Sequence, residues 1–429
     1  MFGVGGGKFS FMEKNILILA TTGGFVYKFE LENVKILQRL GYTVHYAGNT
    51  YDQHYFFEDS VIKNTDIQVH HIDIARSPYM LKNNRKAFCQ LVEIVKKYKI
   101  QAIHCHTPVG GVLGRLIGRY FRVDKLRVIY TAHGFHFYKG APLINNSIYF
   151  GVEKLLAPYT DTLIVINEED YRNARRFRLK KGGKCYKIPG VGLDMEQFCP
   201  MEEKTCIEQR RKLGIDEKDF FFVSVGELNE NKNQEIVLKT LLQMKKENKD
   251  ISHMKYGICG EGFYFERIQK EIREWGLEKN VMMYGYCTEV WKILGCADAS
   301  VFPSRREGLG MAGLESLAMG VPVIAADNRG TREYMVHGQN GYICRWDSAD
   351  DFALAIERMK NLTPEEKRKM KTFSRDSVKR FEKSCTGEIM EKVYRELDKQ
   401  LESENAYETA ESRKIYEKKR KDHCYYGSL

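Results

Sequence analysis

The sequence lacks the features that would place it in a membrane or in an oxidising compartment. No stretch approaches the roughly 18 consecutive apolar residues that a membrane-spanning helix needs. The chain before the first apolar run, residues 16–20, is glycine-rich and polar, and no cleavage-like site follows it, so we expect no secretory signal. The eleven cysteines include no C-x-x-C pair. Their scatter favours a reducing cytoplasm over a disulfide framework.

The glycine-rich start of the chain has neither the spacing nor the context of a phosphate-binding loop. Residues 3–8 read GVGGGK, but a P-loop follows a strand, opens a helix and has the spacing G-x4-GK[ST]. This stretch precedes the first predicted strand. We therefore expect residues 1–13 to be disordered, with Met12 as a plausible start of the protein.

Positive charge is concentrated in two parts of the chain, whose net charge is +11. One part, here called the basic run, extends from Tyr171 to Lys187 and contains no acid; the other spans residues 82–99. Such patches fit an anionic membrane surface, a diphosphate-bearing acceptor or nucleic acid, and they also fit a merely solvated face. Because no nucleic-acid module accompanies them, we expect no nucleic-acid partner. The cations of the basic run are Arg172, Arg175, Arg176, Arg178, Lys180, Lys181, Lys184 and Lys187.

Short apolar strands alternate with helices twice along the chain, which predicts an α/β protein with parallel sheets covered by helices. The expected strands are 16–20, 44–47, 102–106, 127–132, 162–166, 221–225, 256–259, 281–284 and 299–302, together with the β-rich run 321–326. The expected helices are 29–40, 90–98, 112–121, 154–159, 236–244 and 265–275. A chain of 429 residues exceeds what one core usually supports. We predict two Rossmann-like domains, 1–190 and 191–375, which are joined through a linker at 187–200 and face a cleft.

The remaining residues, 376–429, are predicted to form a C-terminal helix that returns to the first domain. Their last part, from Glu402 onward, is highly charged and has no apolar stripe. We expect this tail to be mobile.

The most informative segment is 303–326, PSRREGLGMAGLESLAMGVPVIAA. Glu307 lies in the predicted loop, and Glu315 lies about one turn inside the helix that follows. Gly308 and Gly310 bring backbone N–H groups close to a ligand, and the helix N-terminus favours negative charge. The arrangement can hold phosphates at the amides and sugar hydroxyls at the acids.

This segment is similar to the E-x7-E element of the retaining nucleotide-sugar glycosyltransferases of the GT-B fold, family 4, and the resemblance covers about residues 14–400. It implies that Glu315 binds the ribose, that Glu307 binds the donor sugar and that the amides around Leu309–Met311 bind the diphosphate. It further implies that Lys232 neutralises the β-phosphate. The second domain would thus bind the nucleotide-sugar, and the first would bind the acceptor.

The resemblance also assigns residues of the first half. Gly23 and Gly24 follow the first predicted strand, where the family brings its backbone close to the donor diphosphate. His133, in YTAHGFHFYKGAP, matches a histidine that contacts the donor sugar; as a bare pattern it is also compatible with an ordinary loop histidine. One departure is Glu227, which replaces the family's usual arginine. Either Lys232 with a nearby cation such as Arg306 then binds the phosphates, or the side chain of Glu227 points away from the phosphate site.

The runs HCHTPVGG, TAHGFHFYKGAP, INEEDY and IPGVGLD look like those of bacterial enzymes of capsular or exopolysaccharide assembly. This implies a nucleotide-sugar donor, with UDP-sugar favoured, and an acceptor saccharide linked to polyprenyl diphosphate. It also implies a cytoplasmic protein that is peripheral on the inner face of the plasma membrane and needs no metal or other cofactor. His104 and His106 share a strand face and could ligate a metal, but a third ligand at suitable spacing is missing.

Three other interpretations compete with this one. A Rossmann dehydrogenase needs G-x-G-x-x-G after the first strand, where the chain has TTGGFVYK. A GT-B sugar-nucleotide epimerase would not be expected to carry the E-x7-E segment. A non-catalytic subunit that binds nucleotide-sugar or another transferase is favoured by Glu227 alone.

Overall fold

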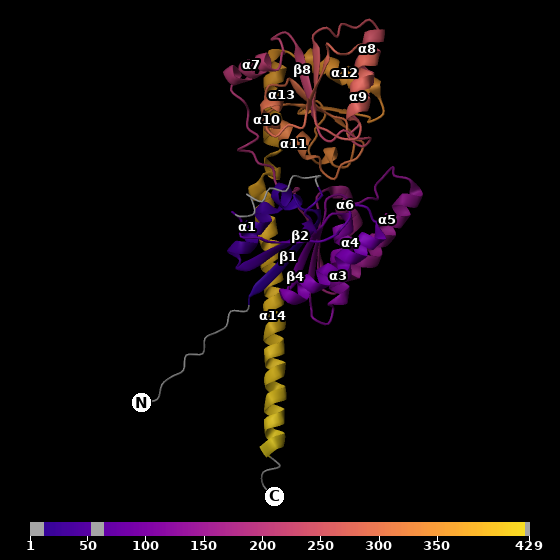
Figure 1. Ribbon diagram of the computed structural model, residues 1–429. Coiled ribbons are helices and arrows are strands. Elements are labelled where there is room, and N and C mark those ends of the chain that lie inside the picture. Colours follow the sequence, from indigo (N-terminus) through magenta and orange to yellow (C-terminus); the bar gives the residue numbers. More distant parts are fainter. Residues whose placement is uncertain (1–12, 53–63, 425–429) are drawn as a thin grey trace. The chain divides into compact units, whose positions relative to one another are not determined.

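The computed structural model describes residues 13–52 and 64–424, with side chains as far as residue 403. The disorder predicted for residues 1–13 falls, apart from Glu13, outside these ranges. Within them no helix has both the length and the apolar composition that crossing a membrane requires. Figure 1 shows the elements and their labels.

The first sheet has seven strands in the order β3-β2-β1-β4-β5-β6-β7. Its inner strands are buried on both faces, which explains why they read as apolar runs in the sequence. The strands are β1 (Lys14–Thr22), β2 (Tyr42–Asn49), β3 (Gln68–His71), β4 (Ala102–His106), β5 (Arg127–Ala132), β6 (Thr162–Val165) and β7 (Lys184–Lys187). Their helices are α1 (Leu31–Arg39), α3 (Leu81–Lys97), α4 (Pro108–Tyr120), α5 (Leu143–Leu156) and α6 (Glu168–Ala174).

Alternate residues of β4 face different helices, as the pleat of a strand requires. Cys105 faces α4, where a Cβ atom on Gly114 would lie only 2.7 Å from the Cβ of Cys105. Only glycine therefore allows α4 this close to the sheet. His104 faces the long C-terminal helix α14 (Lys383–Cys424), and its Nδ1 lies 2.9 Å from the hydroxyl of Tyr394.

The second sheet has six strands in the order β10-β9-β8-β11-β12-β13. Its core contains the stacked rings of Phe222 and Tyr256, whose centroids are 5.3 Å apart. The strands are β8 (Phe220–Val225), β9 (Met254–Cys259), β10 (Val281–Gly285), β11 (Ala299–Phe302), β12 (Val323–Ala326) and β13 (Gly341–Cys344). The helices are α7 (Glu203–Lys212), α8 (Glu235–Lys246), α9 (Phe265–Glu274), α10 (Val290–Leu294), α11 (Met311–Ala318), α12 (Ala349–Lys360) and α13 (Pro364–Ser377).

The predicted fold class is confirmed, since the pairings described in both sheets are parallel. By its contacts the chain divides into two compact units. One comprises 1–130, 159–161 and 387–429, and the other comprises 131–158 and 162–386. The functional boundaries at residues 190 and 375 stay predictions.

The C-terminal helix α14 belongs, from Gly387 onward, to the unit that contains β1, β2 and β4. Asp398 on this helix accepts hydrogen bonds from Lys14 (3.0 Å) and from the hydroxyl of Tyr42 (2.6 Å). The helix continues to Cys424, so the charged tail predicted to be mobile is helical up to that residue.

Candidate functional site

The predicted strand–loop–helix is present as β11, the loop 303–310 and α11. Gly310 adopts φ +92°, a left-handed conformation that favours glycine, and α11 begins directly after it. No described side chain caps this helix end. Its first N–H groups have no intrahelical partner and point out of the helix, where they can bind an anion such as a phosphate.

Lys232 and Glu307 lie in direct contact beside this helix end. Lys232 is in the loop that follows β8, and its Nζ is 2.7 Å from Oε1 of Glu307. Both side chains are mostly buried, with exposed fractions of 25% and 14%. The structure thus brings together two predicted site residues that are 75 positions apart in the chain. A phosphate bound at Lys232 would have its sugar next to Glu307.

Glu315 lies four residues after the first residue of α11, about 6 Å along the helix axis. Its side chain is partly exposed, whereas its neighbours Leu314 and Ser316 are buried. The two acids of the motif are therefore placed as expected, one in the loop and one a turn inside the helix.

His133 packs directly against the motif loop. A Cβ atom on Gly308 would lie 1.9 Å from the carbonyl oxygen of His133, so any other residue at position 308 would separate the two segments. Burial lowers the pKa of His133 to about 4. The imidazole is therefore neutral at pH 7 and can offer a hydrogen bond without a charge.

Sequence reasoning missed a buried ion pair that ties the surrounding loops together. Nη1 of Arg329 lies 2.6 Å from Oδ1 of Asp170, and the exposed fractions of the two side chains are 4% and 0%. The same guanidinium donates to the backbone carbonyls of Phe135 (2.5 Å), Phe137 (3.3 Å) and Glu307 (3.3 Å).

Asn167 extends this network to the motif loop. Its amide nitrogen donates to Asp170 (2.8 Å) and to the carbonyl of Gly308 (2.9 Å). Asn167 and Asp170 belong to the INEEDY run, which sequence analysis used only as a family signal. Nothing in the sequence linked Arg329 to them, because the pair spans 159 positions.

The structure shows where the side chain of Glu227, which replaces the family's usual arginine, is placed. Glu227 is exposed, and its Cγ would lie 3.1 Å from a Cβ atom on Gly262, so the side chain runs along the loop after β9. Arg306 is placed elsewhere, with its guanidinium carbon 5.5 Å from the ring centroid of Tyr138. The neighbouring Arg305 pairs with Glu230 at 2.6 Å.

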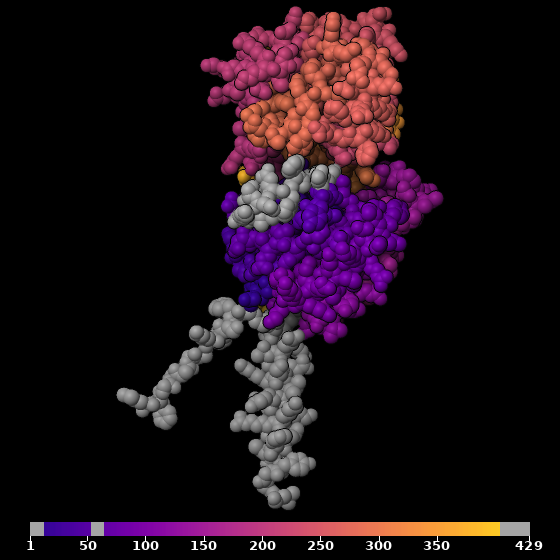
Figure 2. All heavy atoms as spheres, viewed as in Figure 1, coloured from indigo at the N-terminus to yellow at the C-terminus, as the bar shows by residue number. Residues whose placement is uncertain are grey.

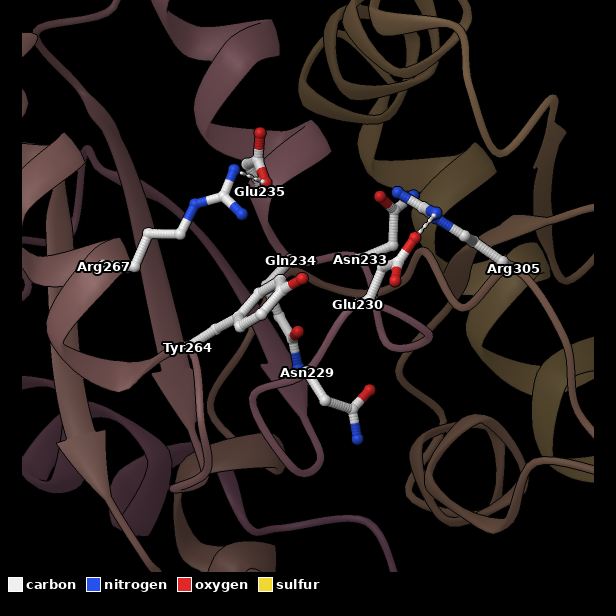
Figure 3. A pocket seen from close by; sticks show the side chains of 8 residues that line it. All are labelled: Asn229, Glu230, Asn233, Gln234, Glu235, Tyr264, Arg267 and Arg305. Atoms are coloured by element: carbon white, nitrogen blue, oxygen red, sulfur yellow. Dashed lines mark hydrogen bonds and ion pairs between the residues drawn. The ribbon is translucent and has the colours of Figure 1, made fainter.

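A small cavity of about 190 Å³ lies next to the Lys232 loop (Figure 3). Both arginines that line it are paired with carboxylates: Arg267 with Glu235 at 2.7 Å, and Arg305 with Glu230 at 2.6 Å. Lys232, Glu307 and Glu315 are not among its lining residues. It is therefore distinct from the predicted site.

Gly23 and Gly24, which are predicted to lie close to the donor diphosphate, belong to the other compact unit. They follow β1, and the N–H of Gly23 donates to the carbonyl of Asn49 at 2.8 Å. A single π-helical turn, Val26–Glu30, comes next and is a rare feature in proteins. Glu30 is buried, and its carboxylate lies 3.3 Å from Nδ1 of His106.

His104 and His106, the two histidines that could ligate a metal, share a strand face as predicted. Their ring centroids are 4.1 Å apart. Each has another partner in the same unit: Tyr394 for His104, and Glu30 for His106. Burial raises the pKa of Glu30 to about 8, so at neutral pH its carboxyl tends to hold a proton.

Comparison with known proteins agrees with this geometry. Residues 207–376 match the family model for glycosyl transferases of group 1, and residues 15–167 match that for glycosyl transferase 4-like domains. The chain is 37% identical over 383 residues to EpsD of Bacillus subtilis (strain 168), which bears the name of a glycosyltransferase. That alignment covers 89% of this chain and 97% of EpsD. This chain belongs to the group 1 glycosyltransferases.

A second relative is more distant. The chain described here is 27% identical over 280 residues to the UDP-Gal:α-D-GlcNAc-diphosphoundecaprenol α-1,3-galactosyltransferase of Escherichia coli. The alignment covers 65% of this chain and 71% of that enzyme.

Solved structures show the same fold. Anabaena HepE in complex with UDP-glucose superposes with a TM-score of 0.71 at 15% identity, covering 89% of this chain and 99% of HepE. The lipopolysaccharide glycosyltransferase WaaG gives 0.68 at 12% identity, covering 88% and 99%. The predicted GT-B architecture is thus confirmed.

Proposed function

We propose that this glycosyltransferase transfers a sugar from a UDP-sugar to a saccharide carried on a polyprenyl diphosphate, during assembly of a cell-surface polysaccharide. The observation that carries the proposal is the Lys232–Glu307 pair beside the open N-terminus of α11. The names of relatives support the substrates: the galactosyltransferase uses UDP-Gal and a diphosphoundecaprenol-linked acceptor, and HepE binds UDP-glucose.

In this proposal each group of the site has a separate task. The amides of Leu309–Met311 hold the diphosphate, and Glu315 accepts hydrogen bonds from the ribose hydroxyls. Glu307 binds the donor sugar, which His133 contacts as a neutral hydrogen-bonding group. Negative charge grows on the β-phosphate as UDP departs, and the fixed cation of Lys232 stabilises it in the transition state. Retention of the anomeric configuration is part of the proposal.

Glu227 does not prevent this assignment. A carboxylate repels phosphate, but Glu227 is exposed and lies along the Gly262 loop, whereas Lys232 points at Glu307. Lys232 is therefore the main phosphate cation in the proposal. Arg306, whose guanidinium lies over the ring of Tyr138, is the second candidate for a cation that binds the phosphates.

The acceptor would reach the protein from the membrane. We assign acceptor binding to the first domain, residues 1–190, together with Gly23 and Gly24 near the donor diphosphate. The basic run fits an anionic lipid surface, at which each nearby Lys or Arg contributes about 1 kcal/mol. The protein would then be peripheral on the cytoplasmic face.

A panel of nucleotide-sugars tests the donor assignment. We expect a UDP-sugar at 100 times its dissociation constant to raise the free energy of unfolding by about 2.7 kcal/mol, measured by thermal denaturation. GDP- and TDP-sugars at equal concentration serve as controls. Transfer is then measured with the stabilising donor and polyprenyl-diphosphate saccharides. If a nucleotide-sugar stabilised the protein but was neither used in transfer nor epimerised, the non-catalytic alternative would be supported. If the sugar were epimerised but not transferred, the epimerase alternative would be supported.

The two glutamates of the motif should respond differently to neutralisation. Glu315→Gln is expected to weaken binding of UDP itself by about tenfold or more, because hydrogen bonds to a charged acceptor are lost. Glu307→Gln should leave UDP affinity nearly unchanged and lower transfer, since its partner is the sugar. Titration calorimetry with UDP checks both variants, each serving as the control for the other. Equal losses of UDP affinity would refute this division of roles.

A further inference from the structure

Two cysteines meet at the carboxyl ends of the neighbouring strands β9 and β10. Cys259 is the last residue of β9, and Cys287 follows the last residue of β10 by two positions. Gly285 pairs with Cys259 in the parallel ladder, and the N–H of Gly260 donates to the carbonyl of Gly285 at 2.7 Å. The side chain of Cys287 turns back toward this point, with its Sγ 3.5 Å from the same carbonyl oxygen. The thiol of Cys259 thus donates a hydrogen bond to the sulfur of Cys287.

The two thiols differ in reactivity. Cys259 is buried, with 2% of its surface exposed, and its hydrogen bond and its burial raise its pKa above the usual range. Cys287 is partly exposed, and the hydrogen bond from Cys259 lowers its pKa to about 7. A large fraction of Cys287 is therefore a thiolate at neutral pH, which is the nucleophilic form of cysteine. Figure 2 shows that the segment between the two cysteines, coloured salmon, lies at the molecular surface.

A third thiol in this region is less reactive. Cys296 is near enough to interact electrostatically with Cys259. It is 1% exposed, its Sγ donates to the carbonyl of Ile293 at 3.2 Å, and burial raises its pKa to about 12. It therefore stays protonated at neutral pH. An accessible thiolate with a second thiol beside it is the arrangement found in redox-sensitive cysteines, and only Cys287 with Cys259 provides it in this group of three.

We propose that Cys259 and Cys287 are a modification site at which a hydroperoxide forms a reversible disulfide. The thiolate of Cys287 attacks one oxygen of hydrogen peroxide, the O–O bond breaks and hydroxide leaves, which produces a sulfenic acid. The sulfur of Cys259 then displaces the sulfenic oxygen, which leaves as water with the proton of the Cys259 thiol. Two thiols are oxidised in total and one peroxide is reduced to water. Exchange with a cellular thiol reverses the reaction.

The loop that follows Cys259 is attached to the Lys232 loop. The N–H of Leu228 donates to the carbonyl of Glu261 at 2.8 Å, and the N–H of Tyr264 donates to the carbonyl of Leu228 at 3.0 Å. Leu228 precedes Lys232 by four residues. A disulfide draws the two sulfurs to about 2.0 Å, closer than a hydrogen bond holds them, and so shifts the strand ends and these loops. We therefore expect the disulfide to slow sugar transfer, and this consequence rests on the proposed function.

Mass spectrometry tests the disulfide directly. The reduced full chain is treated with hydrogen peroxide, free thiols are blocked with N-ethylmaleimide, and the protein is digested. We expect a cross-linked pair of peptides containing Cys259 and Cys287, which dithiothreitol separates. Cys259→Ser should abolish the cross-link and leave a sulfenic acid on Cys287 that dimedone labels. Cys199→Ser, at an exposed cysteine elsewhere in the chain, is the control and should leave the cross-link unchanged.

Two results of this experiment would overturn the proposal. One is oxidation of Cys287 that is no faster than that of the exposed Cys199 in the same unaltered protein. The other is oxidation of Cys287 that produces no link to Cys259. Both are measured in the unaltered chain, so they do not depend on whether a cysteine variant folds.

Activity measures the consequence for the donor site. Peroxide should lower the turnover number of the unaltered protein by about tenfold or more, because misplacing a catalytic group by an ångström costs up to about 10²-fold. Dithiothreitol should restore the rate, and peroxide should leave Cys287→Ser within about twofold of its untreated rate. Full turnover of the cross-linked protein would overturn the effect on transfer. A reduced protein that transfers no sugar would contradict the proposed function, whereas the cross-link is measured without a substrate.

Discussion

Replacing Lys232 by alanine is expected to lower the turnover number by about 10²–10³-fold, which is the effect of removing one donor that stabilises charge developing in a transition state. The donor's Michaelis constant should rise much less. The reason is that Lys232 acts more strongly on the departing diphosphate than on the bound substrate, so its loss raises the barrier more than it weakens binding. Steady-state kinetics with the UDP-sugar found in the screen measure both constants.

Lys292→Ala is the matched control for this variant. Lys292 also forms an ion pair with a glutamate at 2.7 Å, Glu289, but both side chains are about half exposed. Its removal should leave turnover unchanged. If Lys232→Ala retained full turnover, Arg306 would be the next cation to replace.

The structure also predicts that the effects on turnover of replacing Lys232 and of replacing Glu307 depend on each other. Lys232→Ala leaves the mostly buried Glu307 carboxylate without its cation. The double variant Lys232→Ala, Glu307→Gln should therefore lose less turnover than the product of the two single losses. If the loss of turnover in the double variant equalled the product of the two single losses, the 2.7 Å contact would not matter during catalysis.

Sequence reasoning found the inner strands, which are buried on both faces, and one edge strand, β10, whose residues 281–284 form a short apolar run. β4, β5 and β11 match the expected ranges residue for residue. The strands it missed, β3, β7 and β13, all lie at sheet edges. An edge strand such as Lys184–Lys187 is half exposed and contains polar residues, so it has no continuous apolar run to mark it.

Helix α5 was largely missed for a related reason. The sequence predicts that residues 154–159 are part of a helix; the helix covers Leu143–Leu156, and a 3-10 turn, Ala157–Tyr159, follows it. Sequence reasoning expects the apolar residues of a helix to be buried, but in α5 Ile144, Ile148 and Leu155 are exposed and only Leu156 is buried.

Within the site, local motifs were predictable and long-range partners were not. The positions of Glu307 and Glu315 follow from one loop and one helix, whose pattern is contained in 24 consecutive residues, 303–326. The Arg329–Asp170 pair joins segments 159 positions apart. Burial of both partners is a consequence of tertiary packing, and it leaves no periodic signal in either segment.

Arg329→Met is expected to lower the free energy of unfolding by about 3–5 kcal/mol at neutral pH, because it leaves Asp170 buried without its cation. It also removes the donor shared by the carbonyls of Phe135, Phe137 and Glu307. Urea denaturation measures the loss. Arg332→Met is the control: Arg332 pairs with Asp327 at 2.7 Å, but both side chains are about half exposed, so the cost should stay within about 1 kcal/mol.

The pH dependence of this loss provides a sharper test. Burial raises the pKa of Asp170 to about 6, and Arg329 opposes that rise, so without Arg329 the folded-state pKa should be higher still. A carboxyl whose pKa is raised in the folded protein costs stability as pH rises from its unfolded-state pKa up to its folded-state pKa, because in that range only the unfolded chain has released the proton, and the cost is constant above it. The deficit of Arg329→Met should therefore grow between pH 6 and pH 8, and that of Arg332→Met should not. A deficit of Arg329→Met that is the same at both pH values would show that Asp170 does not depend on Arg329 for its charge.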